Sequence, residues 1–230
     1  FTLINHYIKI ALNYGGSKMS EIRRINCGTG NCYIVTDGSN AILVDTGSKE
    51  NIKDVMAECD KYDMKLIVLT HVHFDHAENA SALSEKYNIP VAIHPLDEEL
   101  FDSYDKQALH SYGLIGKIIL VLSVKKLSNI KIEKPKNLIF VKDKDELSKY
   151  GVNATIIELP GHTKGSIGVD TGEGLVVGDA LDNWISPATG HLYNDINEIK
   201  KTAEKIKALG ERTLYYGHGK PSNNSFKMLK

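Results

Sequence analysis

Four side chains of the kinds that bind metal ions occur within six residues, in the segment HVHFDH at 71–76. The chain has nine His and 15 Asp in 230 residues, so chance alone would give this H-x-H-x-D-H pattern with a probability of roughly one in a thousand. The segment follows a short apolar run that is typical of a buried strand. Alternate residues of an extended segment point the same way, so His71, His73 and Asp75 can converge from one loop, with His76 beside them. The pattern predicts a metal site at the end of a strand.

Three further candidates follow predicted strands later in the chain and have glycine neighbours. They are His162 in LPGHTKGS, Asp179 in VVGDAL and His218 in YYGHGKP. Small neighbours let the backbone and a bound ion approach closely, and loops at strand ends commonly carry functional residues. We expect these three residues to join the first cluster. The remaining histidines lack such settings and are predicted to have surface or packing roles: His6, His94, His110 and His191.

The elements that would position these residues are short strands that alternate with helical patterns. The first predicted strands form a hairpin, 34–36 with 41–44, around the turn DGSN. Apolar spacing predicts helices at 52–59, around Leu83 and Tyr87, and at 196–209. Further strands are predicted at 66–69, 91–93, 138–141, 154–157, 167–169, 175–177 and 213–216. Two β-rich halves, each covered by helices, favour two sheets packed face to face with helices outside.

The segment 100–135 differs from its surroundings because it contains GLIGKIILVLSVKKL, in which apolar residues fall on nearly every face of a helix. A helix is expected here, and three placements of 109–127 stay open. The helix can complete the core, form a homodimer contact, or lie over the site as a lid. As a lid, the apolar residues of 114–122 and the adjacent Tyr112 would form a wall that favours substrates with a hydrophobic part.

The composition indicates a soluble chain with one large domain or two small ones. Of 230 residues, 42% are hydrophobic and 25% are charged, and 28 Lys and Arg against 29 Asp and Glu leave a formal net charge of −1. A dedicated nucleic-acid-binding protein normally carries a basic surplus, so no nucleic-acid partner is expected. No apolar run reaches the roughly 18 residues of a membrane span, so no membrane association is expected either.

Cysteine usage favours a reducing, cytoplasmic compartment. Cys27, Cys32 and Cys59 are too few and too irregularly spaced for a disulfide framework, and each is predicted to be a small buried side chain. Residues 1–18 lack the pattern of a secretory signal. We treat 1–18 as an N-terminal extension, with Met19 as an alternative start, and 19–230 as a single domain.

The motifs resemble those of the metallo-β-lactamase-fold hydrolase superfamily, with the glyoxalase II-like branch most similar and no subfamily assigned. HVHFDH, GHT, GDA and GHG occur in the family's order within about 22–221. The resemblance implies an α+β fold, a four-layer αββα sandwich with metal ions at the sheet edges. The segment near 100–135 would then be a helical insertion.

The resemblance also implies roles for the site residues. His71, His73 and His162 resemble the ligands of a first metal ion, Asp75, His76 and His218 resemble those of a second, and Asp179 would bridge both. Asp45, in VDTG, matches the family's early acidic residue. In the family this residue is not itself a metal ligand but holds a ligand histidine in place. That role is physically reasonable because a ligating imidazole usually donates its other N–H to a carboxylate or carbonyl.

A set of seven nitrogen and oxygen ligands without cysteine suits two divalent ions, zinc first, with iron or manganese as alternatives. Two ions about 3.5 to 4 Å apart share a water and lower its pKa toward 7, which supplies a metal-bridging hydroxide as nucleophile. Asp75 is expected to be catalytic as well as a ligand, because it can orient the hydroxide and carry a proton to the leaving group. The predicted reaction is hydrolysis of an ester, thioester or lactone bond in a small molecule, including one with a hydrophobic acyl group.

This chain differs from several subgroups of the superfamily at single positions, and these differences narrow the range of predicted reactions. β-Lactamases carry Cys or Ser in place of Asp179, flavodiiron oxygen reductases carry Glu in place of His73, and quorum-quenching lactonases carry Tyr in place of Asp182. The helical carboxyl-terminal domain of glyoxalase II and the tRNA-gripping arm of ribonuclease Z are not expected here. Two alternatives remain: a mononuclear-iron oxidoreductase similar to persulfide dioxygenases, and a phosphodiesterase or ribonuclease Z-like hydrolase. A non-catalytic descendant is disfavoured because all seven ligand positions are filled.

Overall fold

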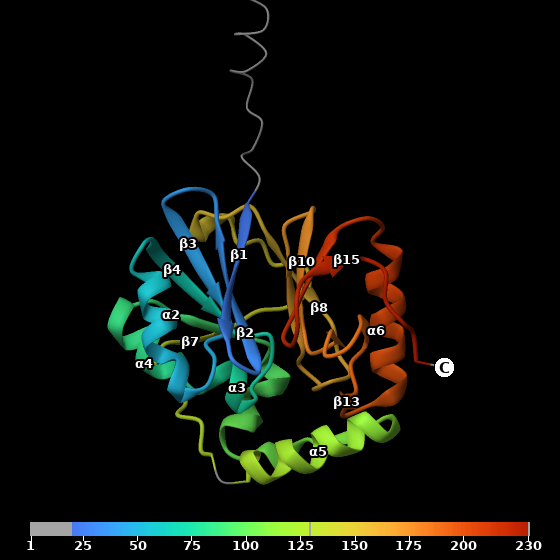
Figure 1. Ribbon diagram of the computed structural model, residues 1–230. Helices are drawn as coiled ribbons and strands as arrows, with labels where there is room; N and C mark the ends of the chain where they lie inside the picture. The colour runs from blue at the N-terminus through green and yellow to red at the C-terminus, as the bar shows by residue number, and fades with distance from the viewer. Residues whose placement is uncertain (1–19, 129, 230) are drawn as a thin grey trace, which may run out of the picture.

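Two β-sheets packed face to face form the centre of the molecule in the computed structural model, which describes residues 20–128 and 130–229 (Figure 1). The first sheet has the strand order β1 (Glu21–Cys27), β2 (Gly30–Thr36), β3 (Asn40–Val44), β4 (Asp63–Val68), β5 (Val91–Ile93) and β7 (Leu138–Phe140). The second has the order β15 (Ser222–Asn223), β14 (Thr213–Tyr216), β10 (Gly174–Gly178), β9 (Ile167–Asp170) and β8 (Thr155–Glu158). The predicted extension 1–18, with His6, and the alternative start Met19 lie outside the described residues.

The central strands are apolar on both faces because each face meets a different layer. Along β2, Cys32 and Ile34 pack in the outer cluster beneath helices, whereas Tyr33 and Val35 pack in the cluster between the sheets. This alternation follows from the two-residue period of a strand. Every residue of β2 is buried.

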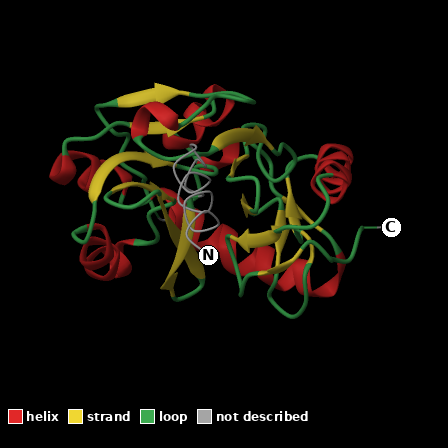
Figure 2. Ribbon diagram, turned by 90° about the horizontal axis from the view of Figure 1, so that it is seen from above, coloured by secondary structure: helices red, strands yellow, loops and turns green. Residues whose placement is uncertain are grey.

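Helices cover the outer faces of both sheets, which gives the predicted four-layer αββα order. On the first sheet these are α2 (Ile52–Cys59) and α4 (Ala80–Tyr87), and on the second α6 (Ile196–Ala208). In Figure 2, strands face one another across the middle and helices lie at the left and right sides. The helix α6 begins at Asp195, whose carboxylate accepts hydrogen bonds from the N–H groups of Asn197 and Glu198 and so caps the first turn.

The strand directions bring the ends of five strands to one edge of the sandwich. β3 and β4 run parallel in the first sheet, and β10 and β14 run parallel in the second. β8 has the same direction as β10, because both pair antiparallel with β9. The loops that leave the carboxyl ends of these strands therefore lie close together.

The predicted hairpin, helices and longer strands are confirmed to within a few residues. The strand β1 escaped prediction because only Ile25 and Cys27 of its seven residues are buried, and its remaining residues are largely exposed at the sheet edge. Also unpredicted were the short helix α3 (Phe74–Ala77) and five two-residue strands: β6 (His110–Ser111), β11 (Leu181–Asp182), β12 (Ala188–Thr189), β13 (Leu192–Tyr193) and β15 (Ser222–Asn223).

The apolar segment folds as α5 (Gly113–Leu127), which crosses one end of the sandwich beneath both sheets (Figure 1). The pairing of β6 with β13 and a hydrogen bond from the Tyr112 N–H to the His191 carbonyl (2.9 Å) anchor its start. Leu114 and Val121 are 76% and 70% exposed, so α5 does not complete the core. Its position at the end of the sandwich agrees with the lid placement, and the homodimer contact stays a prediction. No helix among the described residues is both long and apolar enough to cross a membrane.

Candidate metal centre

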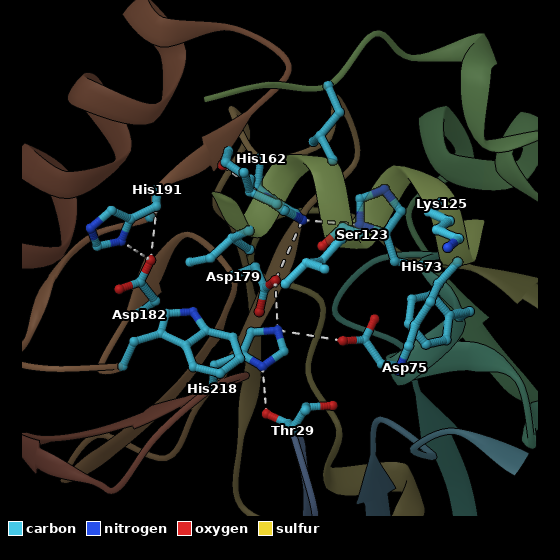
Figure 3. A pocket seen from close by; sticks show the side chains of 18 of the residues that line it. Thr29, His73, Asp75, Ser123, Lys125, His162, Asp179, Asp182, His191 and His218 are labelled. Atoms are coloured by element: carbon cyan, nitrogen blue, oxygen red, sulfur yellow. Dashed lines mark hydrogen bonds and ion pairs between the residues drawn. The ribbon is translucent and has the colours of Figure 1, made fainter. Parts of the chain in front are cut away.

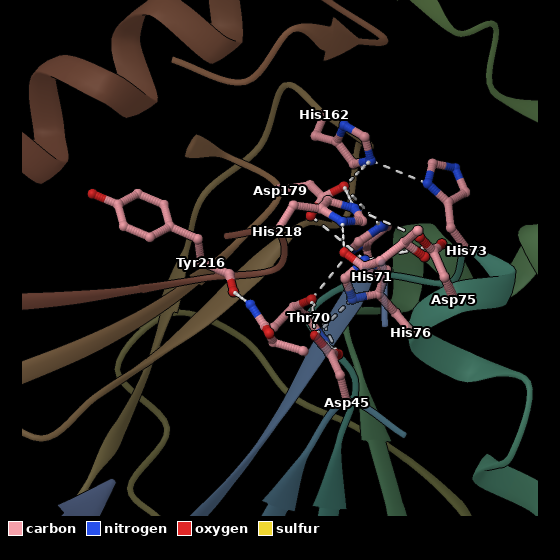
Figure 4. Close-up of polar contacts among 12 residues, drawn as sticks. Asp45, Thr70, His71, His73, Asp75, His76, His162, Asp179, Tyr216 and His218 are labelled. Atoms are coloured by element: carbon pink, nitrogen blue, oxygen red, sulfur yellow. Dashed lines mark hydrogen bonds and ion pairs between the residues drawn. The ribbon is translucent and has the colours of Figure 1, made fainter. Parts of the chain in front are cut away.

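The structure brings all seven predicted ligand residues together at the shared edge of the two sheets (Figure 4). The segment 71–76 follows β4, His162 follows β8, Asp179 follows β10 and His218 follows β14. Within each of three overlapping groups, the donor atoms lie within 4.8 Å of one another. We call His71, His73 and His162 the first ligand group, and Asp75, His76 and His218 the second ligand group.

Asp179 lies between the two ligand groups and contacts both. Its Oδ2 is 3.5 Å from His162 Nε2 in the first group and 3.2 Å from His218 Nε2 in the second. Its Oδ1 is 3.5 Å from His76 Nε2. Gly217 allows this approach, because a Cβ at that position would lie 2.1 Å from Asp179 Oδ1. This is the placement that a bridging carboxylate requires.

Three polar atoms at the centre of the cluster make no hydrogen bond to any described residue: His71 Nε2, His76 Nε2 and Asp179 Oδ1. All three atoms are buried, and buried polar atoms in proteins almost always have a partner. Imidazole nitrogens and carboxylate oxygens are suitable donors for zinc and related divalent ions. The residues therefore fit a bound metal centre.

Hydrogen bonds behind the cluster fix which imidazole nitrogen faces its centre. His162 Nδ1 donates to the Leu192 carbonyl (2.9 Å), and His218 Nδ1 donates to the Thr29 carbonyl (2.6 Å). His76 Nδ1 donates to Asp45 Oδ2 (2.9 Å). Each bond leaves Nε2 directed at the cluster, which is how outer partners usually orient metal ligands.

Asp45 connects the ends of β3 and β4 to the cluster. It is completely buried, and besides His76 it accepts hydrogen bonds from the Thr70 N–H (2.8 Å) and the Thr70 hydroxyl (2.9 Å). Its backbone has a φ of +61°, a left-handed conformation that is uncommon outside glycine. The structure thus places Asp45 behind His76, where the resemblance expected an acidic residue.

The carboxylates divide the histidines into two electrostatic classes. Burial lowers the pKa of His71 and His73 well below the usual range, and neighbouring imidazoles add to this effect. Burial also acts to lower the pKa of His76 and His218, but nearby carboxylates outweigh it. The pKa is raised to about 10 for His76 and to about 9 for His218, with Asp179 the largest raising influence on both. Conversely, burial acts to raise the pKa of Asp179, but these two histidines hold it well below its usual range.

A cavity of about 710 Å³ opens from the cluster toward α5 (Figure 3). Five of the seven predicted ligands line its inner end: His73, Asp75, His162, Asp179 and His218. Ile119 and Leu122 of α5 form part of its wall, as the lid alternative expected, together with Leu109, Ile130 and Trp184. The cavity is large enough for a small organic molecule.

Several residues that shape the site had no recognisable signal in the sequence. The buried carboxylate of Asp97 accepts hydrogen bonds from the Thr163 hydroxyl (2.7 Å) and the Gly165 N–H (2.8 Å), and so fixes the loop that carries His162. His191 was assigned a surface or packing role, but it lines the cavity and its Nδ1 lies 2.6 Å from Asp182 Oδ2. The first contact joins residues 66 positions apart and the second joins residues nine positions apart, so local motifs do not reveal them.

Comparison with known proteins agrees with this geometry. The model of the metallo-beta-lactamase superfamily matches residues 25–218, and the chain belongs to this superfamily. A curated relative, "Probable metallo-hydrolase MJ0888" of Methanocaldococcus jannaschii, is 31% identical over 201 residues, which cover 82% of this chain and 87% of the relative. Hydroxyacylglutathione hydrolase 1 of Vibrio vulnificus is 27% identical over 187 residues, which cover 81% of this chain but only 60% of that enzyme.

Solved structures share the fold. The structure of TTHA1623 in a di-iron-bound form matches with a TM-score of 0.64 and 22% identity, over 89% of this chain and 94% of that one. Together, the family and the grouped His and Asp side chains indicate a metal-dependent hydrolase.

The substitution Asp45→Asn should weaken metal binding without unfolding the protein. The amide keeps the size of the side chain but loses the negative charge that faces His76. Loss of such an outer partner typically lowers metal affinity about 10- to 100-fold. Competition with a chelator would measure the change. Asp54→Asn, at an exposed position on α2, is the matched control, and equal affinity in both variants would contradict the role of Asp45.

Metal binding should release protons. With pKa values of about 10 and 9, His76 and His218 are protonated at pH 7, and each must lose its Nε2 proton to bind a cation. We therefore expect release of at least two protons per chain at pH 7, because a metal-bound water adds to the two protons from these histidines, and an affinity that rises as the pH increases toward 9. Calorimetric zinc titrations in buffers with different ionisation enthalpies measure this number. A pH-independent affinity with no proton release would contradict the assignment.

Proposed function

We propose that the protein is a binuclear metal-dependent hydrolase that cleaves an ester, thioester or lactone bond in a small molecule with a hydrophobic acyl group. The observation that carries this proposal is the position of Asp179 between two ligand groups at the inner end of an apolar-walled cavity. Zinc is the expected metal, with iron or manganese as alternatives. The di-iron form of the structural relative supports iron as one of these alternatives.

Two divalent ions held here would lower the pKa of a shared water toward 7 and polarise the oxygen of the scissile bond. The chain's own residues supply the remaining steps. The Asp75 side chain is 16% exposed and lines the cavity, with its Oδ2 3.5 Å from His218 Nε2. It can therefore accept a proton from the attacking water and return it to the leaving group.

The wall formed by α5 supports the choice of substrate class. Ile119 and Leu122 face the cavity from α5, and Leu109 and Ile130 lie on the segments that flank this helix. An acyl chain placed against these side chains would leave water, and each buried methylene would contribute up to about 0.8 kcal/mol. The name of the Vibrio relative, hydroxyacylglutathione hydrolase, is consistent with an acyl substrate.

The substitution Asp75→Asn should affect turnover far more than folding. The amide has a similar shape, but it cannot carry a proton and it is a weaker metal ligand. We expect ester hydrolysis to fall by two or more orders of magnitude, with a melting temperature close to that of the wild type. Elemental analysis of the wild type, purified after growth with added metal, should give two ions per chain.

Two results would count against the proposal. Wild-type turnover of a generic ester by Asp75→Asn would refute the role of Asp75. One iron per chain in the wild type, with oxygen consumption in the presence of a persulfide, would instead support the dioxygenase alternative.

The substitution Ile119→Ser should weaken the preference for longer acyl groups. Ile119 lines the cavity, and loss of its apolar contact with an octanoyl chain corresponds to about 1.5 kcal/mol, or roughly a tenfold lower kcat/KM. The acetyl ester should be unaffected because it is too short to reach the helix. The measurement is kcat/KM for 4-nitrophenyl esters from acetyl to octanoyl.

Ile118 provides the matched control, because it is the neighbouring residue, is 57% exposed and does not line the cavity. Ile118→Ser should keep the wild-type dependence on chain length. If the wild type shows no such dependence, or if both variants change it equally, α5 does not select the acyl group.

A further inference from the structure

Trp184, the single tryptophan of the chain, stacks on the ligand histidine His218. The ring centroids are 4.5 Å apart and the planes differ by 17°. The other ring contacts of the cluster are different: His71, His73 and His162 meet one another edge to face, at interplanar angles of 82° to 90°. Among the ring contacts described for the ligand residues, the contact of His218 with Trp184 is the one in which the two rings are stacked nearly parallel.

The backbone fixes the position of the indole over His218. The Asn183 N–H donates to the His218 carbonyl (2.9 Å), and the Asn183 side chain donates to the Lys220 carbonyl (2.7 Å). Gly219 has a φ of +99°, and a Cβ there would lie 2.1 Å from the Asn183 carbonyl oxygen. The segments on either side of the stack are thus held in direct contact, and Trp184 follows Asn183 immediately.

His218 is more exposed than three of the other ligand histidines. Its side chain is 9% exposed, against 0–2% for His71, His76 and His162. It lies in a loop between Gly217 and Gly219, and its Nδ1 bond to the Thr29 carbonyl fixes one edge of the ring (Figure 3). This bond and the contact of Nε2 with Asp179 Oδ2 (3.2 Å) both act at the edge of the ring, so they do not fix its tilt about the line that joins the two nitrogens. A parallel ring against the flat face determines it.

We propose that Trp184 is a positioning residue for the second ligand group: its indole fixes the tilt of His218, shields the imidazole from water and so strengthens binding of the second metal ion. The proposal rests on the two-metal centre of the proposed function. Trp184 is 40% exposed, so its side chain contributes little to the hydrophobic core. Among the described residues, the aromatic ring that it contacts is that of His218.

The first test is metal affinity in Trp184→Ala and Trp184→Phe, measured with zinc and a competing chelator. An aromatic pair contributes enough to change an equilibrium constant by about two- to tenfold. Trp184→Ala should therefore hold one of its two zinc ions about two- to tenfold less tightly than the wild type, with the affinity for the other unchanged. Trp184→Phe keeps a flat ring and should restore most of the affinity. Ile185→Ala, at a neighbouring position that is 78% exposed, is the control and should bind both ions as the wild type does.

The second test uses the fluorescence of Trp184 in the wild-type protein, since no other tryptophan contributes to the emission. Addition of zinc to the metal-free protein should change the emission when the second ligand group fills, because a metal ion then binds the imidazole that stacks on the indole. The change should be absent in His218→Ala. This readout does not depend on the stability of a Trp184 variant.

The possible outcomes separate this proposal from the proposed function. If the wild type binds one zinc ion per chain, the two-metal centre is wrong and this proposal is overturned with it. If the wild type binds two ions, and Trp184→Ala binds both equally well, only the role of Trp184 is refuted. Two bound ions without any change in emission would refute it as well.

Discussion

The contact of one carboxylate, Asp179, with imidazoles from both ligand groups is the interaction around which the site is organised. Asp179 leaves the second sheet at β10, whereas His71 and His76 leave the first sheet at β4. The charge of Asp179 is stabilised by the two histidines whose pKa values it raises, His76 and His218. Donors from both sheets meet at this carboxylate, so the site exists only when the two halves of the sandwich are packed together.

Asp45 shows how the fold holds a costly arrangement in place. Its left-handed backbone conformation costs about 1–2 kcal/mol in a residue with a side chain. Against this, a hydrogen bond to a charged group contributes about 1.5–3 kcal/mol, and Asp45 accepts bonds from the Thr70 N–H, the Thr70 hydroxyl and His76 Nδ1. These three hydrogen bonds together contribute more than the backbone conformation costs. They therefore hold Asp45 in the conformation that directs its carboxylate at His76.

The sequence predicted the parts of this protein that depend on local pattern. The central strands have continuous apolar runs, and HVHFDH places its donors on one short segment. Parts that depend on distant contacts were not predictable in this way. Asp97 acts on the loop of His162 from 65 positions away, Trp184 reaches His218 through an irregular loop, and the edge strand β1 has too few buried residues to show a pattern. The apolar composition of α5 predicted a helix, but only its anchoring through β6 determined which side covers the cavity.

That anchoring also links the cavity wall to the predicted metal ligands. Leu192 of β13 is paired with Ser111, at the start of the α5 insertion, and its carbonyl accepts the hydrogen bond that orients His162. A change in the length or attachment of the insertion would thus reach His162 through a single residue, whereas an exchange of side chains farther along α5 would not. The position of His162 is thus coupled to the root of the helix, where Ser111 meets Leu192, and not to the side chains along its length.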